Sequence, residues 1–263
     1  AELLGTMFIL LFGNGVNAMF VLFNLGGYTN ITFGWGLGVF LGILVSNRIT
    51  GAHLNPAVTL ALILTKRFPL KKAPLYMSAQ MLGGFLGAAI VYFFYQAKFK
   101  QFDPNLEHTA GIFSTFPAIT NTFMPGFLAE IIASAILMFA ILAIVENFIN
   151  DKAGFLAPFA VAALIVAIGM SFGAMHGYAM NPARDFSPRL FTAIMGFKNN
   201  GLTDGSLIWA APVFGSLIGA IIVGVFRNGL TLAGVDLYYQ VLAVGLLIIF
   251  AVTIDQWIRK ART

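Results

Sequence analysis

Long apolar runs separated by short polar segments dominate the chain. We expect apolar spans at about 3–23, 32–47, 74–96, 127–148, 156–174 and 207–226, close to the roughly 20 residues that cross a bilayer. Two shorter segments, at about 56–66 and 182–195, each follow a proline and are too short to span. Half-helices of this kind are tolerated only where their entry loops line a wet cavity. The pattern predicts an all-α membrane protein with six transmembrane helices and two re-entrant half-helices.

The two halves of the chain repeat each other. Ala1-Glu2-Leu3-Leu4 is echoed by Ala129-Glu130-Ile131-Ile132, and the segment GAHLNPA at 51–57 is echoed by GYAMNPA at 177–183. Each predicted half holds three full spans, so an odd number of crossings inverts the second half relative to the first. The two half-helices should then enter from opposite faces, with their N-termini meeting near the midplane.

Composition agrees with a membrane location. Hydrophobic residues make up 59% of the chain and charged residues only 10%, against about 25% charged residues in soluble domains. Basic residues gather in short loops, at Arg48, Lys66, Arg67, Lys71 and Lys72. This is the positive-inside pattern, which favours a role in orientation over nucleic-acid binding. Cysteine is absent, which excludes disulfides, thiolate catalysis and cysteine metal sites.

The ends of the chain need separate interpretation. We divide it into a channel domain, 1–228 (first repeat 1–96, long loop 97–125, second repeat 126–228), and an extension, 229–263. The uncharged run 237–254 is long enough for a seventh span, which we slightly favour. An interfacial or re-entrant helix is the alternative, because spanning would put the basic cluster at 259–262 outside. The chain starts without Met inside an apolar run, so we expect a short preceding cytoplasmic segment and no signal peptide.

The two Asn-Pro-Ala turns carry the chemistry. They are Asn55-Pro56-Ala57 and Asn181-Pro182-Ala183. Two facing helix N-termini place about half a positive charge each at the centre of a pore. The asparagine amides can cap these helices and still offer an N–H to a passing hydroxyl. This predicts a channel for oriented, uncharged permeants, in which proton wires break and cations are repelled.

These motifs resemble the aquaporin (major intrinsic protein) family over about residues 1–228. Asp185 directly after Arg184 is similar to the glycerol-conducting aquaglyceroporin branch. The resemblance implies a homotetramer in which every subunit has its own pore. It also implies a selectivity filter of Trp35, Gly169, Tyr178 and Arg184, and pore loops supported by Glu2, Glu130 and Asp185. The implied ladder of pore carbonyls comprises Gly51, Ala52, His53, Leu54, Gly177, Tyr178, Ala179 and Met180.

Each of these residues has a plainer interpretation. Trp35 could be an interfacial anchor, Gly169 a packing glycine, Tyr178 a belt aromatic and Arg184 a structural cation. Together they form a coherent ring for a polyol, with aromatic faces for its carbons and Arg184 for its hydroxyls. Gly169 leaves the opening wide, where water-selective relatives carry His. The branch usually has Phe at position 178, so the Tyr178 hydroxyl should add polarity and bulk.

Three other polar residues carry less information. We expect His176 at the outer mouth as an ordinary polar loop residue, with pH sensing as the alternative. Asp103 and Glu107 suggest a solvated face.

Several function classes remain in competition. We favour a passive channel for glycerol, other small polyols and water. The alternatives are a channel mainly for urea, lactic acid, a metalloid hydroxide or water, and less plausibly an ion-coupled transporter. An enzyme is disfavoured because HExxH and GxSxG motifs are missing, and we expect no cofactor or metal. The plasma membrane is the expected location, with a bacterial inner membrane slightly favoured, and the lipid bilayer is the expected surrounding.

Overall fold

The computed structural model is helical, and it describes residues 1–120, 122–149, 154–236, 239–240, 242–243 and 245–246. The long helices are α1 (Glu2–Phe23), α2 (Tyr28–Thr50), α4 (Ala73–Phe94), α6 (Met124–Ile149), α7 (Ala157–Phe172) and α9 (Ala210–Leu232). The short ones include α3 (Pro56–Leu64), α5 (Gln96–Phe102) and α8 (Pro182–Ile194). No strand occurs among the described residues. The all-α prediction is confirmed.

The predicted spans and half-helices agree with these helices. Of the described helices, five are long and apolar enough to cross a membrane by length and composition: α1, α2, α4 (extended by its preceding turn), α6 and α9. α7 is apolar but has 16 residues, shorter than the predicted 156–174. The expected seventh span at 237–254 lies almost wholly outside the described residues.

The two repeats interlock through their half-helices. α1 packs on α2 and α4, while α6 packs on α7 and α9. The half-helix α3 of the first repeat lies against α9 of the second, and α8 lies against α4 of the first. Glycines permit the close approach in both halves: a Cβ at Gly83 would lie 2.2 Å from the Leu3 carbonyl oxygen, and one at Gly219 would lie 2.5 Å from that of Ile131. Each half-helix thus packs against a helix of the other repeat, and this packing holds both half-helices inside the bundle.

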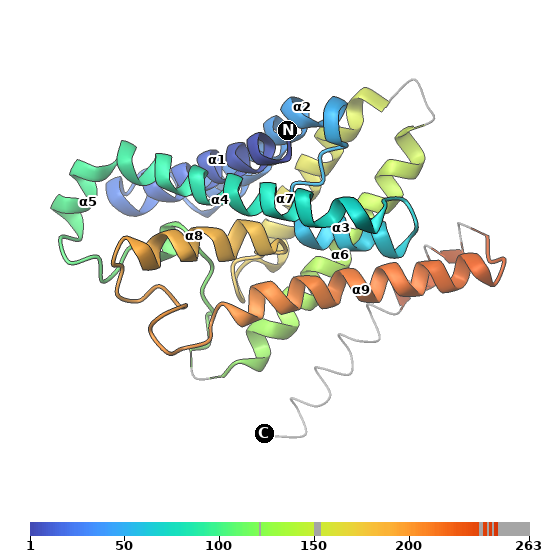
Figure 1. Ribbon diagram of the computed structural model, residues 1–263. Coiled ribbons are helices and arrows are strands. Elements are labelled where there is room, and N and C mark those ends of the chain that lie inside the picture. The colour runs from blue at the N-terminus through green and yellow to red at the C-terminus, as the bar shows by residue number, and fades with distance from the viewer. Residues whose placement is uncertain (121, 150–153, 237–238, 241, 244, 247–263) are drawn as a thin grey trace.

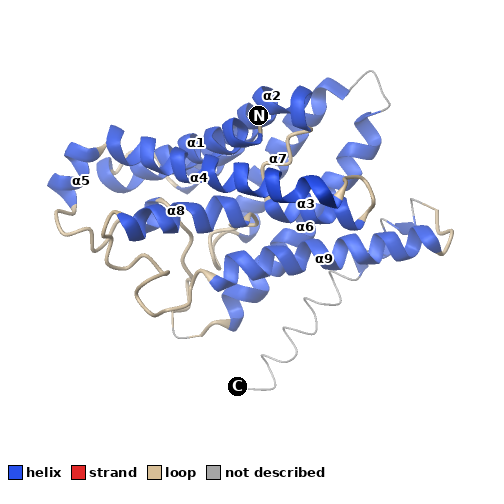
Figure 2. Cartoon of the chain, viewed as in Figure 1, coloured by secondary structure: helices blue, strands red, loops and turns tan. Residues whose placement is uncertain are grey.

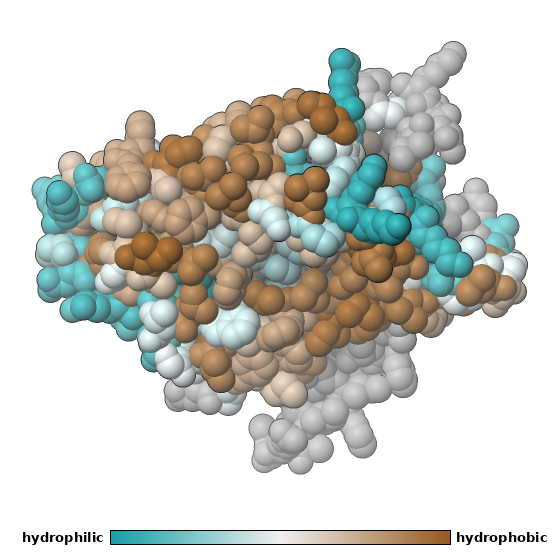
Figure 3. All heavy atoms as spheres, in the orientation of Figure 1, coloured by the Kyte–Doolittle hydropathy of each residue, from teal (hydrophilic) through white to brown (hydrophobic). Residues whose placement is uncertain are grey.

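The surface separates into an apolar band and two polar ends (Figure 3). Large apolar side chains on the outward faces of the helices are exposed, for example Leu37, Leu75 and Phe94. Long loops gather at the end of the molecule where α5 lies and α8 ends (Figures 1 and 2). A continuous apolar flank of this kind suits contact with lipid, because exposed apolar area on that scale would be a liability in water.

A folded loop covers the α5 end of the bundle. We call residues 103–120 the connecting loop. Asp103 organises it, because its carboxylate accepts hydrogen bonds from the backbone N–H groups of Glu107, His108 and Thr109 at 2.8 to 3.0 Å. Asp103 is 3% exposed, so the expectation of a solvated face was wrong at this residue. Burial raises the pKa of Asp103, but these hydrogen bonds outweigh burial and hold the pKa below its ordinary value.

Asp103→Asn should loosen the connecting loop at neutral pH. The depressed folded-state pKa means that the carboxylate stabilises the fold above its unfolded-state pKa of about 4, and that this contribution is lost as pH falls through the lower folded-state value. Hydrogen exchange of the 103–109 segment should therefore be faster in the variant at pH about 7, and the difference should shrink below pH about 4. Exposed Glu107→Gln is the control, expected to exchange like the parent. A difference that persisted unchanged in acid would contradict the assignment.

Candidate pore and filter

A cavity of about 850 Å³ runs between the two repeats. Apolar side chains of α1, α2, α6 and α7 form one wall, including Ile9, Val39, Leu137 and Ile165. The opposite side carries the polar sequence motifs. The predicted site residues that line the cavity are Trp35, Gly51, Ala52, His53, Leu54, Asn55, Tyr178, Ala179, Met180, Asn181 and Arg184. The cavity is thus amphipathic along its length.

The two Asn-Pro-Ala turns meet inside the protein. The side-chain oxygen of Asn55 caps α3 by accepting from the Ala57 N–H at 2.8 Å. That of Asn181 caps α8 by accepting from Ala183 at 3.0 Å. Each asparagine Nδ2 also donates across to the other loop, Asn55 to the Met180 carbonyl at 2.8 Å and Asn181 to the Leu54 carbonyl at 2.9 Å. An amide has two N–H groups, so each side chain keeps one for another acceptor.

Pro56, Ala57, Pro182 and Ala183 do not line the cavity. They form the first turns of α3 and α8, and all four are buried. Proline suits this position because its missing N–H would have no partner in the helix. Their contribution is to start each half-helix directly behind its asparagine.

The loops that precede the two turns share an unusual backbone. We call residues 51–55 the first pore loop and residues 177–181 the second. Left-handed φ angles occur at matching places: Gly51 (81°) and Gly177 (85°), Ala52 (51°) and Tyr178 (42°), Leu54 (52°) and Met180 (51°). Non-glycine residues in this region cost about 1–3 kcal/mol each, so the surroundings must hold them in place.

Two buried carboxylates hold these loops. Glu2, 3% exposed, accepts from the backbone N–H groups of His53 at 3.0 Å and Leu54 at 2.8 Å. Glu130, fully buried, accepts from those of Ala179 and Met180, both at 2.9 Å. The matched contacts explain why both repeats carry an intramembrane glutamate, which would otherwise be costly.

The Glu2 anchor has partners that the sequence did not reveal. Gln80 donates to Glu2 at 2.7 Å, and the Thr50 hydroxyl donates at 2.6 Å. The available signal in the sequence was a glutamine within an apolar span. In the structure this glutamine is fully buried. The ring of His53 packs beside this group: its centroid is 4.5 Å from that of Phe68 and 5.0 Å from that of Tyr76.

Arg184, Trp35 and Tyr178 come together at the α5 end of the cavity. The guanidinium carbon of Arg184 lies 3.9 Å from the centroid of the Trp35 ring, a cation–π distance. Its Nη1 lies 3.5 Å from the Phe113 carbonyl oxygen and 3.7 Å from the Asp185 carboxylate. All three side chains are less than 8% exposed, and all three line the cavity. They can therefore present a fixed cation against the Trp35 face, with Tyr178 lining the same cavity.

Gly169 contributes indirectly, since it does not line the cavity itself. A Cβ at Gly169 would lie 2.8 Å from the ring carbon Cζ of Tyr178 and 2.9 Å from Cγ2 of Thr32. The absent side chain therefore makes room for the tyrosine ring. The Tyr178 hydroxyl is buried and has no hydrogen-bond partner among the described residues. The sequence suggested that this hydroxyl would add polarity to the opening, but its oxygen atom is buried.

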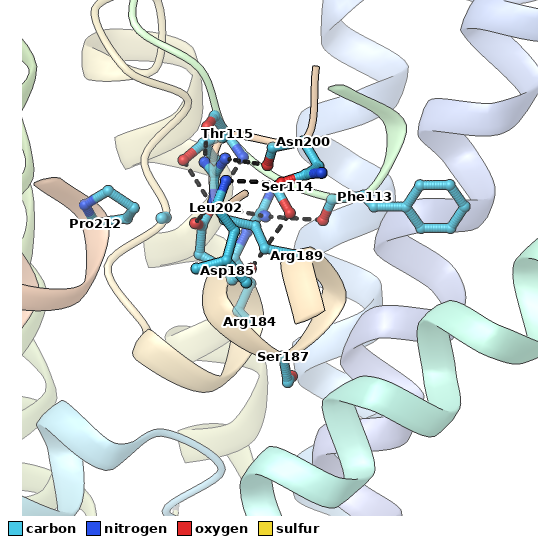
Figure 4. Close-up of polar contacts among 12 residues, drawn as sticks. Phe113, Ser114, Thr115, Arg184, Asp185, Ser187, Arg189, Asn200, Leu202 and Pro212 are labelled. Carbon is cyan, nitrogen blue, oxygen red and sulfur yellow. Dashed lines mark hydrogen bonds and ion pairs between the residues drawn. The ribbon is translucent and has the colours of Figure 1, made fainter. Parts of the chain in front are cut away.

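Asp185 supports the filter from behind (Figure 4). It is fully buried and accepts from Arg189 Nε at 2.5 Å, from the Thr115 N–H at 2.7 Å and from the Thr115 hydroxyl at 2.8 Å. Arg189, also fully buried, donates in addition to the carbonyl groups of Thr115 and of Asn200. Sequence reasoning missed Arg189 and Thr115. The i, i+4 spacing of Asp185 and Arg189 on one helix was the signal for the first.

An ion-paired group lies at the other end of the cavity. Glu146 of α6 pairs with Arg67, which follows α3, and with Arg227 of α9. Arg67 and Glu146 line the cavity, so this mouth carries both charge signs. This three-residue contact could not be predicted from the sequence, because the residues come from three separate segments.

The fold and the site define a class of protein: a helical membrane channel built from two inverted halves, with an amphipathic cavity between them. Comparison with known proteins places the chain within that class. Residues 1–223 match the family described as major intrinsic protein, and the chain belongs to this family.

Proteins similar to this chain are described as glycerol uptake facilitators or as an aquaglyceroporin. The chain is 41% identical over 231 residues to the glycerol uptake facilitator protein of Bacillus subtilis, covering 86% of this chain and 82% of that protein. It is 39% identical over 234 residues to a probable glycerol uptake facilitator protein of Thermotoga maritima, covering 88% and 97%. Among solved structures, the aquaglyceroporin from Plasmodium falciparum superposes with a TM-score of 0.78 at 32% identity, covering 88% of this chain and 94% of that one.

Proposed function

We propose that the protein is a passive channel that conducts glycerol and other small neutral polyols together with water, and that it excludes ions and protons. The contact of Arg184 with Trp35, beside the Tyr178 ring at the cavity wall, carries this proposal. Two aromatic faces accept the carbon edge of a polyol, while the guanidinium donates to its hydroxyl edge. The relatives described as glycerol facilitators support the same solute class.

The geometry suggests how a permeant is guided. Beyond the filter, carbonyl groups of the two pore loops would accept hydrogen bonds from its hydroxyls and replace lost hydration. The free N–H of each asparagine would then donate to the same oxygen at the centre. The apolar wall of α1, α2, α6 and α7 would face the carbon backbone. A water molecule held by both asparagines cannot pass a proton onward along a continuous wire.

The same proposal includes the orientation, the location and the assembly of the channel. The loop with Lys66, Arg67, Lys71 and Lys72 would face the cytoplasm, so the filter end would face outside. We place the channel in the cell membrane, with a bacterial inner membrane favoured, as a homotetramer with one pore in each subunit. Residues 1–228 would form the channel domain and 229–263 an extension.

Stopped-flow light scattering on proteoliposomes tests the function. Vesicles containing the protein should swell faster than protein-free vesicles in gradients of glycerol and should shrink faster in osmotic gradients of an impermeant solute. Glycerol entry at the protein-free rate would rule out a polyol channel. Faster entry of urea or lactic acid than of glycerol would instead favour a different neutral solute. Dependence on an imposed ion gradient would favour a coupled transporter.

Arg184→Ala should make the channel leak protons or small cations. The variant removes a fixed positive charge at the narrow end of the cavity, and a barrier lowered by about 1.4 kcal/mol raises flux about tenfold. A pH-sensitive dye trapped in the vesicles would report the proton leak, with the exposed Lys198→Ala as a matched loss of one positive charge. Proton conductance at the parent level would refute the role given to Arg184.

A further inference from the structure

His176 occupies a place that the proposed permeation pathway does not use. It lies in the loop between α7 and α8, and it is 1% exposed. The expectation of an ordinary polar residue at the mouth was therefore wrong. Its Nδ1 lies 3.5 Å from the carboxylate oxygen Oε1 of Glu130 and 3.3 Å from the hydroxyl oxygen of Thr115. α6 approaches the ring so closely that a Cβ at Gly126 would lie 2.4 Å from its Cδ2.

The two neighbours of His176 belong to different supports of the pore. Glu130 holds the second pore loop through Ala179 and Met180. Thr115 holds Asp185, which in turn binds Arg189 and lies beside Arg184. Nδ1 of His176 therefore lies close both to the carboxylate that holds the second pore loop and to the threonine that holds Asp185 beside Arg184.

Hydrogen-bond bookkeeping indicates that Nδ1 carries a proton. Glu130 can only accept, and the single Thr115 hydroxyl proton is directed to Asp185 at 2.8 Å. An unprotonated Nδ1 would face two acceptors. A proton on Nδ1 faces both acceptors, with Nδ1 at 3.5 Å from the Glu130 oxygen and 3.3 Å from the Thr115 oxygen.

Oε1 of Glu130 also accepts from the Ala179 N–H at 2.9 Å. The His176 contact therefore falls on the same oxygen that holds the left-handed backbone of the second pore loop.

We propose that His176 is a positioning residue whose Nδ1 donor joins the support of the second pore loop to the support of Arg184, and that loss of this donor lowers glycerol permeation. The permeation part rests on the proposed polyol channel. The positioning part concerns the fold of residues 177–181 and stands apart from any solute. Two readouts therefore separate a failure of this inference from a failure of the proposed function.

The first readout is hydrogen exchange of the pore loops in the purified protein. Residues 177–181 should exchange at least about threefold faster in His176→Leu than in the parent, because the variant loses the Nδ1 donor. His176→Asn keeps a neutral donor near the Nδ1 position and should exchange like the parent. The first pore loop is the internal control and should change little. It is held by Glu2, and no contact between the Glu2 carboxylate and a histidine nitrogen occurs among the described contacts. Equal behaviour of the two loops would overturn the proposal whatever the channel conducts.

The second readout is glycerol permeability of proteoliposomes that contain the same variants. His176→Leu should lose at least about threefold in permeability. His176→Asn should keep the permeability of the parent, because its amide N–H can replace the Nδ1 donor. Exposed His108→Asn, in the connecting loop, should behave like the parent. A loss in His176→Asn as large as that in His176→Leu would overturn the proposal.

Discussion

Asp185→Asn is expected to lower the stability of the protein by about 3–5 kcal/mol, because it removes one partner of a buried ion pair and leaves the other charge uncompensated. Arg189 is fully buried, and its 2.5 Å contact with Asp185 would lose the counter-charge. The Thr115 N–H and hydroxyl would also face an amide that supplies a single acceptor oxygen. The midpoint of thermal unfolding of the purified protein would report the loss.

A matched double variant separates charge from packing. Asp185→Leu with Arg189→Leu removes both charges, and replacement of a buried pair by apolar residues is often close to neutral. We therefore expect the double variant to unfold nearer to the parent than Asp185→Asn does. Exposed Glu107→Gln, which also removes one carboxylate, should leave the midpoint unchanged. An unchanged midpoint in Asp185→Asn would show that the pair does not hold the connecting loop to α8.

The sequence was sufficient for the architecture because each part of it has a local signal. Apolar length fixes the spans, and proline after Asn55 and Asn181 fixes where α3 and α8 begin. The internal repeat marked Glu2 and Glu130 as equivalent positions, and the resemblance to the family implied that they support the two pore loops. The hydrogen bonds of both carboxylates follow the same pattern in the two halves.

Contacts between distant segments could not be anticipated in the same way. Thr115 and His176 lie in polar loops, where composition indicates solvent exposure, yet the fold buries both against α6 and α8. From residue type alone, the Tyr178 hydroxyl was expected to add polarity and bulk to the opening. The structure buries this hydroxyl and packs the ring into the room that Gly169 leaves.

Gly169→Ala is expected to reduce glycerol permeability about tenfold and water permeability clearly less, because inserting one methyl group into a packed site costs about 1–3 kcal/mol. The new Cβ would lie 2.8 Å from Cζ and 3.0 Å from Cε2 of Tyr178, and Thr32 closes the neighbouring side at 2.9 Å. Since Tyr178 lines the cavity, the ring can give way toward Arg184 and Trp35, and this narrows the opening for the larger solute first.

Two further variants decide whether Tyr178 transmits the effect of Gly169→Ala. Gly15→Ala adds the same methyl group on α1, where nothing lies within 4 Å of the new Cβ, and should permeate like the parent. Adding Tyr178→Ala to Gly169→Ala removes the ring that is pushed and should restore glycerol flux, so that the two substitutions are strongly non-additive. Equal losses of glycerol and water flux, or additive effects in the double variant, would show that Gly169 does not set the size of the opening through Tyr178.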